Sequence, residues 1–193
     1  MKKGVFEEII KISSLLKKNK LGIFPCKNSY MIIGLASGDN DKKIRDLKEK
    51  KVVRPLVRVL LELPQDKEIC NYFSSLSNQK KDLIEIFKYS DLIFASVEKG
   101  IGFTFAMNPY ERRLLSILKK AIYASSSNIS GKPTPFSCNL IAKNIKKSVD
   151  FILDVGELQD RRDFAVINLD NLQWLREGSS TSIVDKYLRE IRL

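Results

Sequence analysis

A run of small polar residues at 125–133, Ser-Ser-Ser-Asn-Ile-Ser-Gly-Lys-Pro, is the part of the chain whose residue types are best suited to bind a ligand. It follows a predicted strand, and open α/β sheets place their ligand sites beyond the ends of such strands. Hydroxyl and amide side chains with exposed backbone N–H groups can hold a phosphate without steric obstruction. An ordinary polar turn has the same composition. By itself this segment predicts either a phosphate site or a turn.

The densest cluster of positive charge lies at 42–58, where the only acidic residues are Asp46 and Glu49. Flexible cations at the junction of a helix and a strand can converge on phosphate oxygens. A solvated helix face, with cations near the helix C-terminus, explains the same run without a ligand. The basic residues of this cluster are Lys42, Lys43, Arg45, Lys48, Lys50, Lys51, Arg54 and Arg58.

The composition excludes several kinds of catalysis. The chain has no histidine, which removes Ser-His-Asp and Cys-His nucleophiles and histidine zinc centres. Its three cysteines are widely spaced, which argues against a disulfide framework and a cysteine zinc site. The remaining chemistry is positioning and electrostatics, or work by carboxylates and lysines. The net charge of +11 favours polyanionic partners such as nucleotides and RNA, although a lysine-rich surface gives the same balance.

The elements that must position these residues alternate between helix and strand, which predicts an α/β fold. We expect one domain over 1–193, with a twisted sheet of parallel and antiparallel strands and flanking helices. The segment 30–35 is expected to be a short helix or turn. Helices are predicted at 5–18, 41–50, 66–76, 79–88, 110–120, 136–144 and 182–191. Strands are predicted at 21–24, 56–63, 91–97, 101–107, 121–124, 149–153, 164–169 and 173–176.

The hydropathy pattern predicts a protein without a membrane anchor. No run approaches the roughly 18 apolar residues that a membrane-spanning helix needs. Acidic residues stand near the N-terminus, at Glu7 and Glu8, where a secretory signal would be apolar. We therefore expect a cytoplasmic protein.

Taken in order, the two polar segments resemble motifs of the YrdC-like threonylcarbamoyl-AMP synthase family, which includes YrdC and YciO. That family carries Lys-x-Arg, a later basic residue, and then Ser-x-Asn within Ser-Ala-Asn-x-Ser-Gly. Lys48 and Arg54 match the basic residues, and Lys50 stands where the arginine would be. Ser126 and Asn128 match Ser-x-Asn. Weaker similarities at 22–25, 34–35, 154–156 and 181–185 extend the resemblance over most of the chain, so a YrdC-like fold is expected.

The resemblance implies that L-threonine, bicarbonate and ATP are converted to threonylcarbamoyl-AMP and pyrophosphate, with Mg²⁺ assistance and no protein-bound metal. The product would serve partner proteins that modify tRNA to threonylcarbamoyladenosine. Asn28 and Ser29 are expected to hold the threonine. The residues expected to bind the phosphates of ATP are Lys48, Lys50, Arg54, Ser126, Asn128 and Ser182.

The chain departs from the family pattern in three places. Cys26-Lys27-Asn28-Ser29 replaces the threonine-and-acid signature, Lys50 loses the bidentate geometry of arginine, and Thr104 stands where another arginine is expected. The first and the last of these departures favour a rival hypothesis. The rival is a non-catalytic module of the same fold that binds double-stranded RNA or tRNA. A structural α/β domain with a lysine-rich surface is a third reading.

Overall fold

The computed structural model describes residues 3–37, 39–48, 55–129, 131–160 and 162–191. Their strands form one mixed sheet in the order β7-β1-β2-β6-β3-β5-β4-β8-β9. The strands are β1 (Gly22–Pro25), β2 (Tyr30–Leu35), β3 (Val57–Leu60), β4 (Leu92–Ser96), β5 (Ile101–Phe105), β6 (Ile122–Ser126), β7 (Phe151–Ile152), β8 (Ala165–Asn168) and β9 (Gln173–Arg176). The helices are α1 (Lys3–Lys17), α2 (Asn40–Leu47), α3 (Lys67–Ser75), α4 (Asn78–Phe87), α5 (Pro109–Leu118), α6 (Lys143–Lys147) and α7 (Thr181–Ile191).

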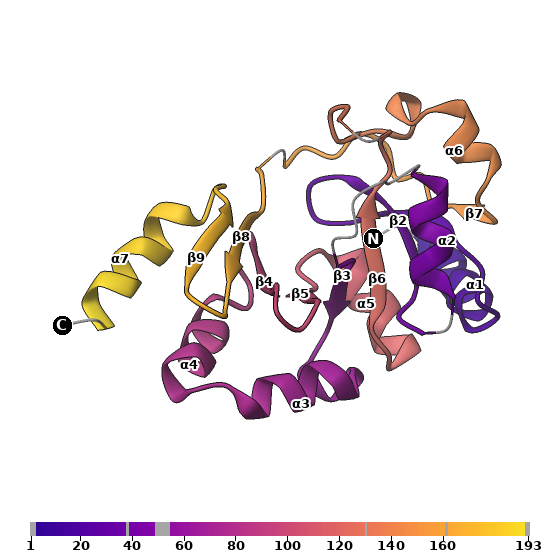
Figure 1. Cartoon of the computed structure of the whole chain (residues 1–193). Helices are drawn as coiled ribbons and strands as arrows, with labels where there is room; N and C mark the ends of the chain where they lie inside the picture. Colours follow the sequence, from indigo (N-terminus) through magenta and orange to yellow (C-terminus); the bar gives the residue numbers. More distant parts are fainter. Residues whose placement is uncertain (1–2, 38, 49–54, 130, 161, 192–193) are drawn as a thin grey trace.

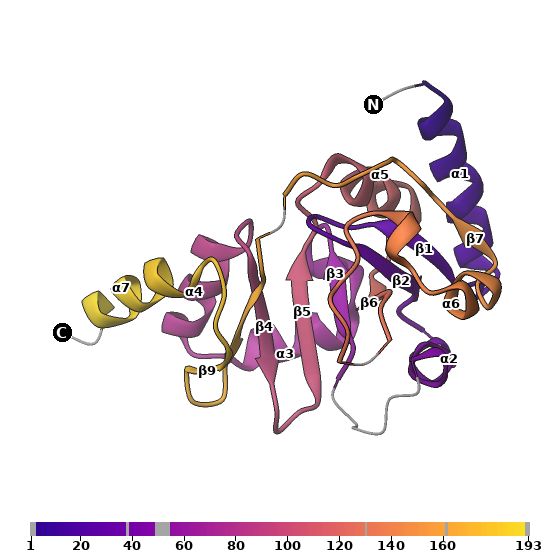
Figure 2. The same cartoon turned by 90° about the horizontal axis from the view of Figure 1, so that it is seen from above.

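The helices cover the two faces of the sheet unevenly (Figures 1 and 2). Helices α1 and α5 pack together over one face at the β1-β2-β6 end, where Ile33, Val59 and Ala124 point toward them. Helices α2 and α6 pack on the opposite face at the same end, through Ile44 and Ile145. Over the middle strands of the sheet, the face that carries α1 and α5 is therefore not covered by either helix.

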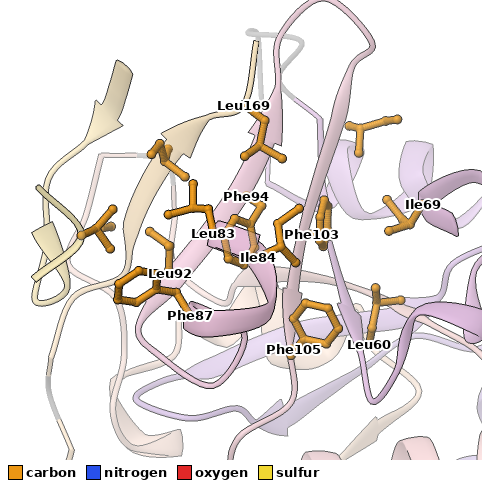
Figure 3. Packing of buried hydrophobic residues seen from close by; sticks show 14 of the residues in the cluster. Leu60, Ile69, Leu83, Ile84, Phe87, Leu92, Phe94, Phe103, Phe105 and Leu169 are labelled. Carbon is orange, nitrogen blue, oxygen red and sulfur yellow. The ribbon is translucent and has the colours of Figure 1, made fainter. Parts of the chain in front are cut away.

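The other half of the sheet is backed by α3, α4 and α7. Figure 3 shows Leu83, Ile84 and Phe87 of α4 packed against Phe94 and Phe103 of the sheet. Residues two apart in a strand share a face, so the alternate side chains of β4 and β5 point away from this core. The open face over β3, β4 and β5 is therefore free to line a cavity.

Local sequence signals fix several element ends. The Asp66 side chain accepts hydrogen bonds from the backbone N–H groups of Glu68 and Ile69 and so caps α3, as its position predicts. Asn108 and Glu111 form a capping box at the start of α5, where Pro109 occupies the first turn. Strands β4 and β5 form the predicted antiparallel pair, which turns at Gly100 with a φ of 63°.

The structure confirms the predicted α/β class and mixed sheet, and corrects two segments. Tyr30–Leu35 is strand β2, not a helix or turn; the run is almost fully buried and apolar, and such a short run carries no period that distinguishes strand from helix. The predicted helix at 136–144 is instead a 3₁₀ turn at Cys138–Leu140 followed by α6. No helix formed by the described residues has the length and apolar character needed to cross a membrane.

Candidate functional site

Side chains from five adjacent strands point to the open face of the sheet. The register pairs Met31 with Ser126, Val57 with Ala124, and Val59 with Thr104. Paired residues lie on the same face, so these six side chains form a continuous floor. Ile93 of β4 extends this floor, because β4 pairs Phe94 with Phe103 of β5.

A cavity of about 290 Å³ lies over this floor. Its rim comes from segments distant in sequence, which Figure 2 shows converging on the middle of the sheet. The rim residues are Cys26, Asn28, Ser29, Glu111, Ser125, Ser126, Thr134, Phe136, Asp163, Phe164 and Arg176. The cavity therefore joins the Ser-rich segment to the turn at 26–29, about a hundred residues earlier in the chain.

The ammonium of Lys48 contacts Ser125 and Ser126, two residues that line the cavity, although Lys48 is not itself among the lining residues. Its Nζ donates to the Ser126 carbonyl at 2.5 Å, to Ser126 Oγ at 2.9 Å, to Asn128 Oδ1 at 3.1 Å and to Ser125 Oγ at 3.3 Å. Lys48 is only 4% exposed, so these oxygens hold its charge away from bulk water. We call Lys48, Ser125, Ser126 and Asn128 the Lys48 wall.

Further hydrogen bonds fix the shape of the Lys48 wall. Ser126 Oγ donates to Asn128 Oδ1 at 2.5 Å, and the Asn128 amide donates to the Lys132 carbonyl. Ser127 is fully buried and donates both its hydroxyl and its backbone N–H to the Tyr30 carbonyl. The loop is thus tied to β2, and its polar groups are set before any ligand arrives.

The predicted basic cluster divides in the structure. Lys48 faces the Ser-rich segment, as expected, whereas Arg58 lies on the opposite side of β3 against Asp66, Glu68 and the Tyr123 ring. Arg45 pairs with Asp41 within α2. The predicted phosphate ligands Lys50 and Arg54 lie outside the described residues, so they stay predictions.

Asn28 and Ser29, predicted to hold a substrate, both line the cavity. The turn that carries them is closed by a hydrogen bond from the Cys26 N–H to the Ser29 carbonyl at 3.0 Å. Ser29 Oγ donates to Asn28 Oδ1 at 3.3 Å, and the Asn28 amide donates to the Arg162 carbonyl. The structure therefore brings Asn28 and Ser29 to the same cavity as Ser125 and Ser126, to which the Lys48 ammonium donates.

Lys27, at the centre of the same turn, forms a buried ion pair with Asp91. Their side chains are 9% and 4% exposed, and Arg162 approaches the other Asp91 oxygen at 3.4 Å. The Lys27 ammonium also lies 3.2 Å from the Met107 sulfur. The Lys27 charge therefore compensates the buried Asp91 carboxylate, and the ion pair anchors the turn.

Glu111 contributes a buried carboxylate to the cavity rim beside this turn. Its Oε2 accepts the N–H groups of Met107 and Asn108 at 3.3 Å each. Burial raises the pKa of Glu111 above its ordinary value, and these hydrogen bonds oppose the rise. Burial, reinforced by the Glu111 charge, raises the pKa of Cys26 well above normal. We call Cys26, Asn28, Ser29 and Glu111 the Glu111 wall.

The structure does not bring Ser182 to the cavity. Ser182 is exposed on α7, which lies at the far end of the molecule from α1 and α2 in both views (Figures 1 and 2). Arg176 of β9 lines the cavity instead, and its Nε donates to the Phe164 carbonyl at 2.9 Å. An arginine held through one nitrogen still presents its other N–H groups to a ligand.

Sequence reasoning missed both Arg176 and Glu111. The Asn-Pro-x-Glu pattern at 108–111 signals a helix start, and nothing in it shows that the glutamate faces a cavity. Arg176 stands in a short exposed strand whose residues carry no motif. Only the folded sheet brings either residue to the site.

Within the described ranges, no three His, Cys, Asp or Glu side chains are grouped to hold a metal ion. The Lys48 wall presents an ammonium, hydroxyls and an amide, a donor set that suits a phosphate and does not suit a resident Mg²⁺.

Comparison with known proteins gives a consistent match. The Sua5/YciO/YrdC family model, described as telomere recombination, matches residues 14–178. A threonylcarbamoyl-AMP synthase from Pyrococcus abyssi is 25% identical over 94% of the chain, which spans only 57% of that relative. A putative threonylcarbamoyl-AMP synthase from Methanocaldococcus jannaschii is 25% identical, with 89% of the chain and 88% of the relative covered. The crystal structure of P. abyssi Sua5 complexed with L-threonine shares the fold, with a TM-score of 0.73 at 22% identity over 90% of this chain and 54% of that one.

Proposed function

The chain belongs to the Sua5/YciO/YrdC family, and from this we propose that it is a threonylcarbamoyl-AMP synthase, a nucleotidyltransferase that joins L-threonine, bicarbonate and ATP. The observation that carries the proposal is the buried Lys48 ammonium, held by Ser126 and Asn128, where Ser126 lines a cavity large enough for a small substrate. The relatives named for this activity support it. So does the threonine complex of the P. abyssi protein.

The chemistry needs little beyond alignment and charge stabilisation. The threonine amine and bicarbonate give a carbamate and water. A carbamate oxygen then attacks the α-phosphorus of ATP, the bond to the bridging oxygen breaks, and pyrophosphate leaves. Negative charge spreads over the phosphoryl oxygens in the transition state, so preorganised cations and hydrogen-bond donors there lower the barrier. The absence of histidine does not impede this reaction.

In this mechanism the Lys48 wall binds the phosphates. The Lys48 ammonium faces the charge that develops at the α-phosphorus, and its position is already fixed by Ser125, Ser126 and Asn128. Arg176 binds the polyphosphate from the opposite rim, together with Lys50 and Arg54 as the resemblance implies. We expect Mg²⁺ to enter bound to the phosphates of ATP, where it neutralises their charge.

Asn28 and Ser29 of the Glu111 wall contact the threonine in this proposal. Placing the amino acid opposite Lys48 sets the carbamate between the two walls, where the attack on phosphorus takes place. The product passes to partner proteins that modify tRNA in the cytoplasm, and the positive net charge favours the encounter with RNA.

The test is pyrophosphate release by the purified chain with ATP, Mg²⁺ and bicarbonate, with and without L-threonine. Release that requires L-threonine, and that D-threonine does not support, is the expected result. Formation of threonylcarbamoyl-AMP is then checked by mass spectrometry. Threonine-independent release, or none, contradicts the proposal.

The side chain of Thr104 favours a second candidate, an RNA-binding module without adenylation activity. Thr104 Oγ1 donates to the Leu92 carbonyl at 2.8 Å, so it supplies no cation where the family resemblance leads us to expect an arginine. This candidate predicts no pyrophosphate release and an affinity for tRNA or duplex RNA that falls steeply with salt.

A further inference from the structure

Glu111 is a buried carboxylate on the cavity rim to which the reaction above gives no role. It is 4% exposed, yet it borders the cavity together with Cys26, Asn28 and Ser29. Asp163, the other carboxylate on the rim, is exposed to solvent. Of these two carboxylates, Glu111 is therefore the one whose charge water screens less.

The charge of Glu111 is not balanced by an ion pair. The nearby Lys27 lowers the pKa of Glu111 only as a distant charge, because its ammonium pairs with Asp91. Among the ion pairs formed by the described residues, none includes Glu111. A buried carboxylate is costly unless hydrogen bonds and an opposite charge compensate it, so a cation that enters the cavity would be stabilised here.

Glu111 also keeps hydrogen-bonding capacity. A carboxylate offers about four acceptor positions. The N–H groups of Met107 and Asn108 engage two of them, both on Oε2. At least one position therefore remains for a donor, on a residue that borders the cavity.

We propose that Glu111 binds the α-ammonium group of the amino-acid substrate. An ammonium is compact, carries the missing positive charge and brings N–H donors to the remaining acceptor position. The ammonium releases one proton to solvent before its nitrogen forms the bond to the bicarbonate carbon, and water is then the leaving group. The carbamate nitrogen keeps one N–H, which can still donate to Glu111. That the amino acid is L-threonine rests on the proposed function, whereas the preference for an ammonium rests on Glu111 itself.

The neutral polar groups beside Glu111 carry no charge to match an ammonium, and solvent screens the Asp163 carboxylate. Thr104 donates its hydroxyl to the Leu92 carbonyl, and the Asn28 amide donates to the Arg162 carbonyl. Ser29 is neutral and bonds to Asn28. Glu111 is therefore the specificity-determining group for the amine end of the substrate.

The test compares Glu111→Gln with the unaltered chain. Glutamine also serves in a capping box, so the substitution keeps the start of α5 and removes only the charge. Calorimetry measures the binding of L-threonine and of 3-hydroxybutyrate, which is threonine without its amino group. We expect the variant to bind L-threonine about tenfold to a hundredfold more weakly. Its affinity for 3-hydroxybutyrate should change less than about twofold, which is within the context-dependence of such effects.

Glu190→Gln is the matched control, because Glu190 is exposed on α7, a helix that does not line the cavity. The control should bind both ligands as the unaltered chain does, and thermal unfolding checks that Glu111→Gln is folded. If the folded Glu111→Gln variant binds L-threonine as tightly as the unaltered chain, the inference is overturned. This holds even if the unaltered chain releases pyrophosphate in a threonine-dependent reaction, as the proposed function requires.

If the unaltered chain does not bind L-threonine, a panel of amino acids is tested, each against its deaminated counterpart. A preference for the amine form that Glu111→Gln abolishes supports the Glu111 assignment and overturns threonine as the substrate. Absence of any amine preference in the unaltered chain overturns the assignment.

Discussion

The two walls of the cavity use their polar groups in opposite ways. In the Lys48 wall, oxygens of Ser125, Ser126 and Asn128 converge on one cation. In the turn beside the Glu111 wall, the cation Lys27 is directed to Asp91, beneath the site. One wall therefore holds a buried cation against Ser125 and Ser126, which line the cavity, and the other places a buried carboxylate on the rim. The partners that the fold gives a cation decide whether its charge lies near the cavity.

The largest effect is expected from removing the Lys27 charge. Lys27→Met leaves the Asp91 carboxylate, 4% exposed, with only the more distant Arg162 as a partner. Loss of one partner of a buried ion pair costs about 3–5 kcal/mol, and urea denaturation should show a loss of this size. The double variant Lys27→Met/Asp91→Leu should recover most of it. A single variant as stable as the unaltered chain would mean that Lys27 is not buried against Asp91.

Removal of the Lys48 ammonium is expected to affect catalysis more than stability. Lys48→Ala should slow threonine-dependent pyrophosphate release about 100-fold to 1,000-fold, as loss of a preorganised donor to transition-state charge does. The thermal midpoint should shift by no more than about 2–4 °C. Asn128→Ala, which removes one acceptor that orients the ammonium, should act in the same direction and by less.

Lys42→Ala is the control for Lys48→Ala, because Lys42 is exposed on α2, the helix whose C-cap is Lys48. It removes one positive charge without changing the cavity. Equal activity losses in Lys42→Ala and Lys48→Ala would indicate a general effect of net charge and would contradict the asymmetry between the two walls.

Substitutions of Arg176 and Ser182 are expected to differ by a smaller amount, in their effect on the KM for ATP. Arg176→Ala should raise the KM for ATP about tenfold, since charge-assisted hydrogen bonds contribute about 1.5–3 kcal/mol and this side chain is partly solvated. Ser182→Ala should leave the KM unchanged within about twofold, the range usual for surface substitutions. Steady-state pyrophosphate release at varied ATP measures both. A reversed order of the two effects would restore Ser182 as a phosphate ligand.

The residues compared above also differ in how far the sequence alone predicts their place in the site. Ser126 and Asn128 stand two apart in one segment, so their shared role is visible as a motif. The alternation of elements likewise predicted the α/β sheet, but not the strand at 30–35. Glu111 and Arg176 border the cavity only because α5 and β9 bring them beside β5, and one sequence carries no signal for that arrangement. Lys27 illustrates the opposite case, a cation that lies beside the site but is paired elsewhere. Its partner Asp91 is 64 positions away, so the sequence does not reveal the pair.

The smallest predicted effect concerns the reactivity of Cys26, which tests how tightly the Glu111 wall is packed. Burial and the Glu111 carboxylate raise the pKa of Cys26, and burial raises that of Cys138 to about 11. Thiolate is the reactive form, so at pH 7–8 iodoacetamide should label half-buried Cys70 first and reach the other two mainly after unfolding. Glu111→Gln removes a charge that disfavours the thiolate, so it should speed labelling of Cys26 and leave Cys138 unchanged. Labelling is read by mass spectrometry of peptides. Equal rates for Cys26 and Cys70 in the folded chain would show that solvent reaches the Glu111 wall as freely as it reaches the outer surface of α3.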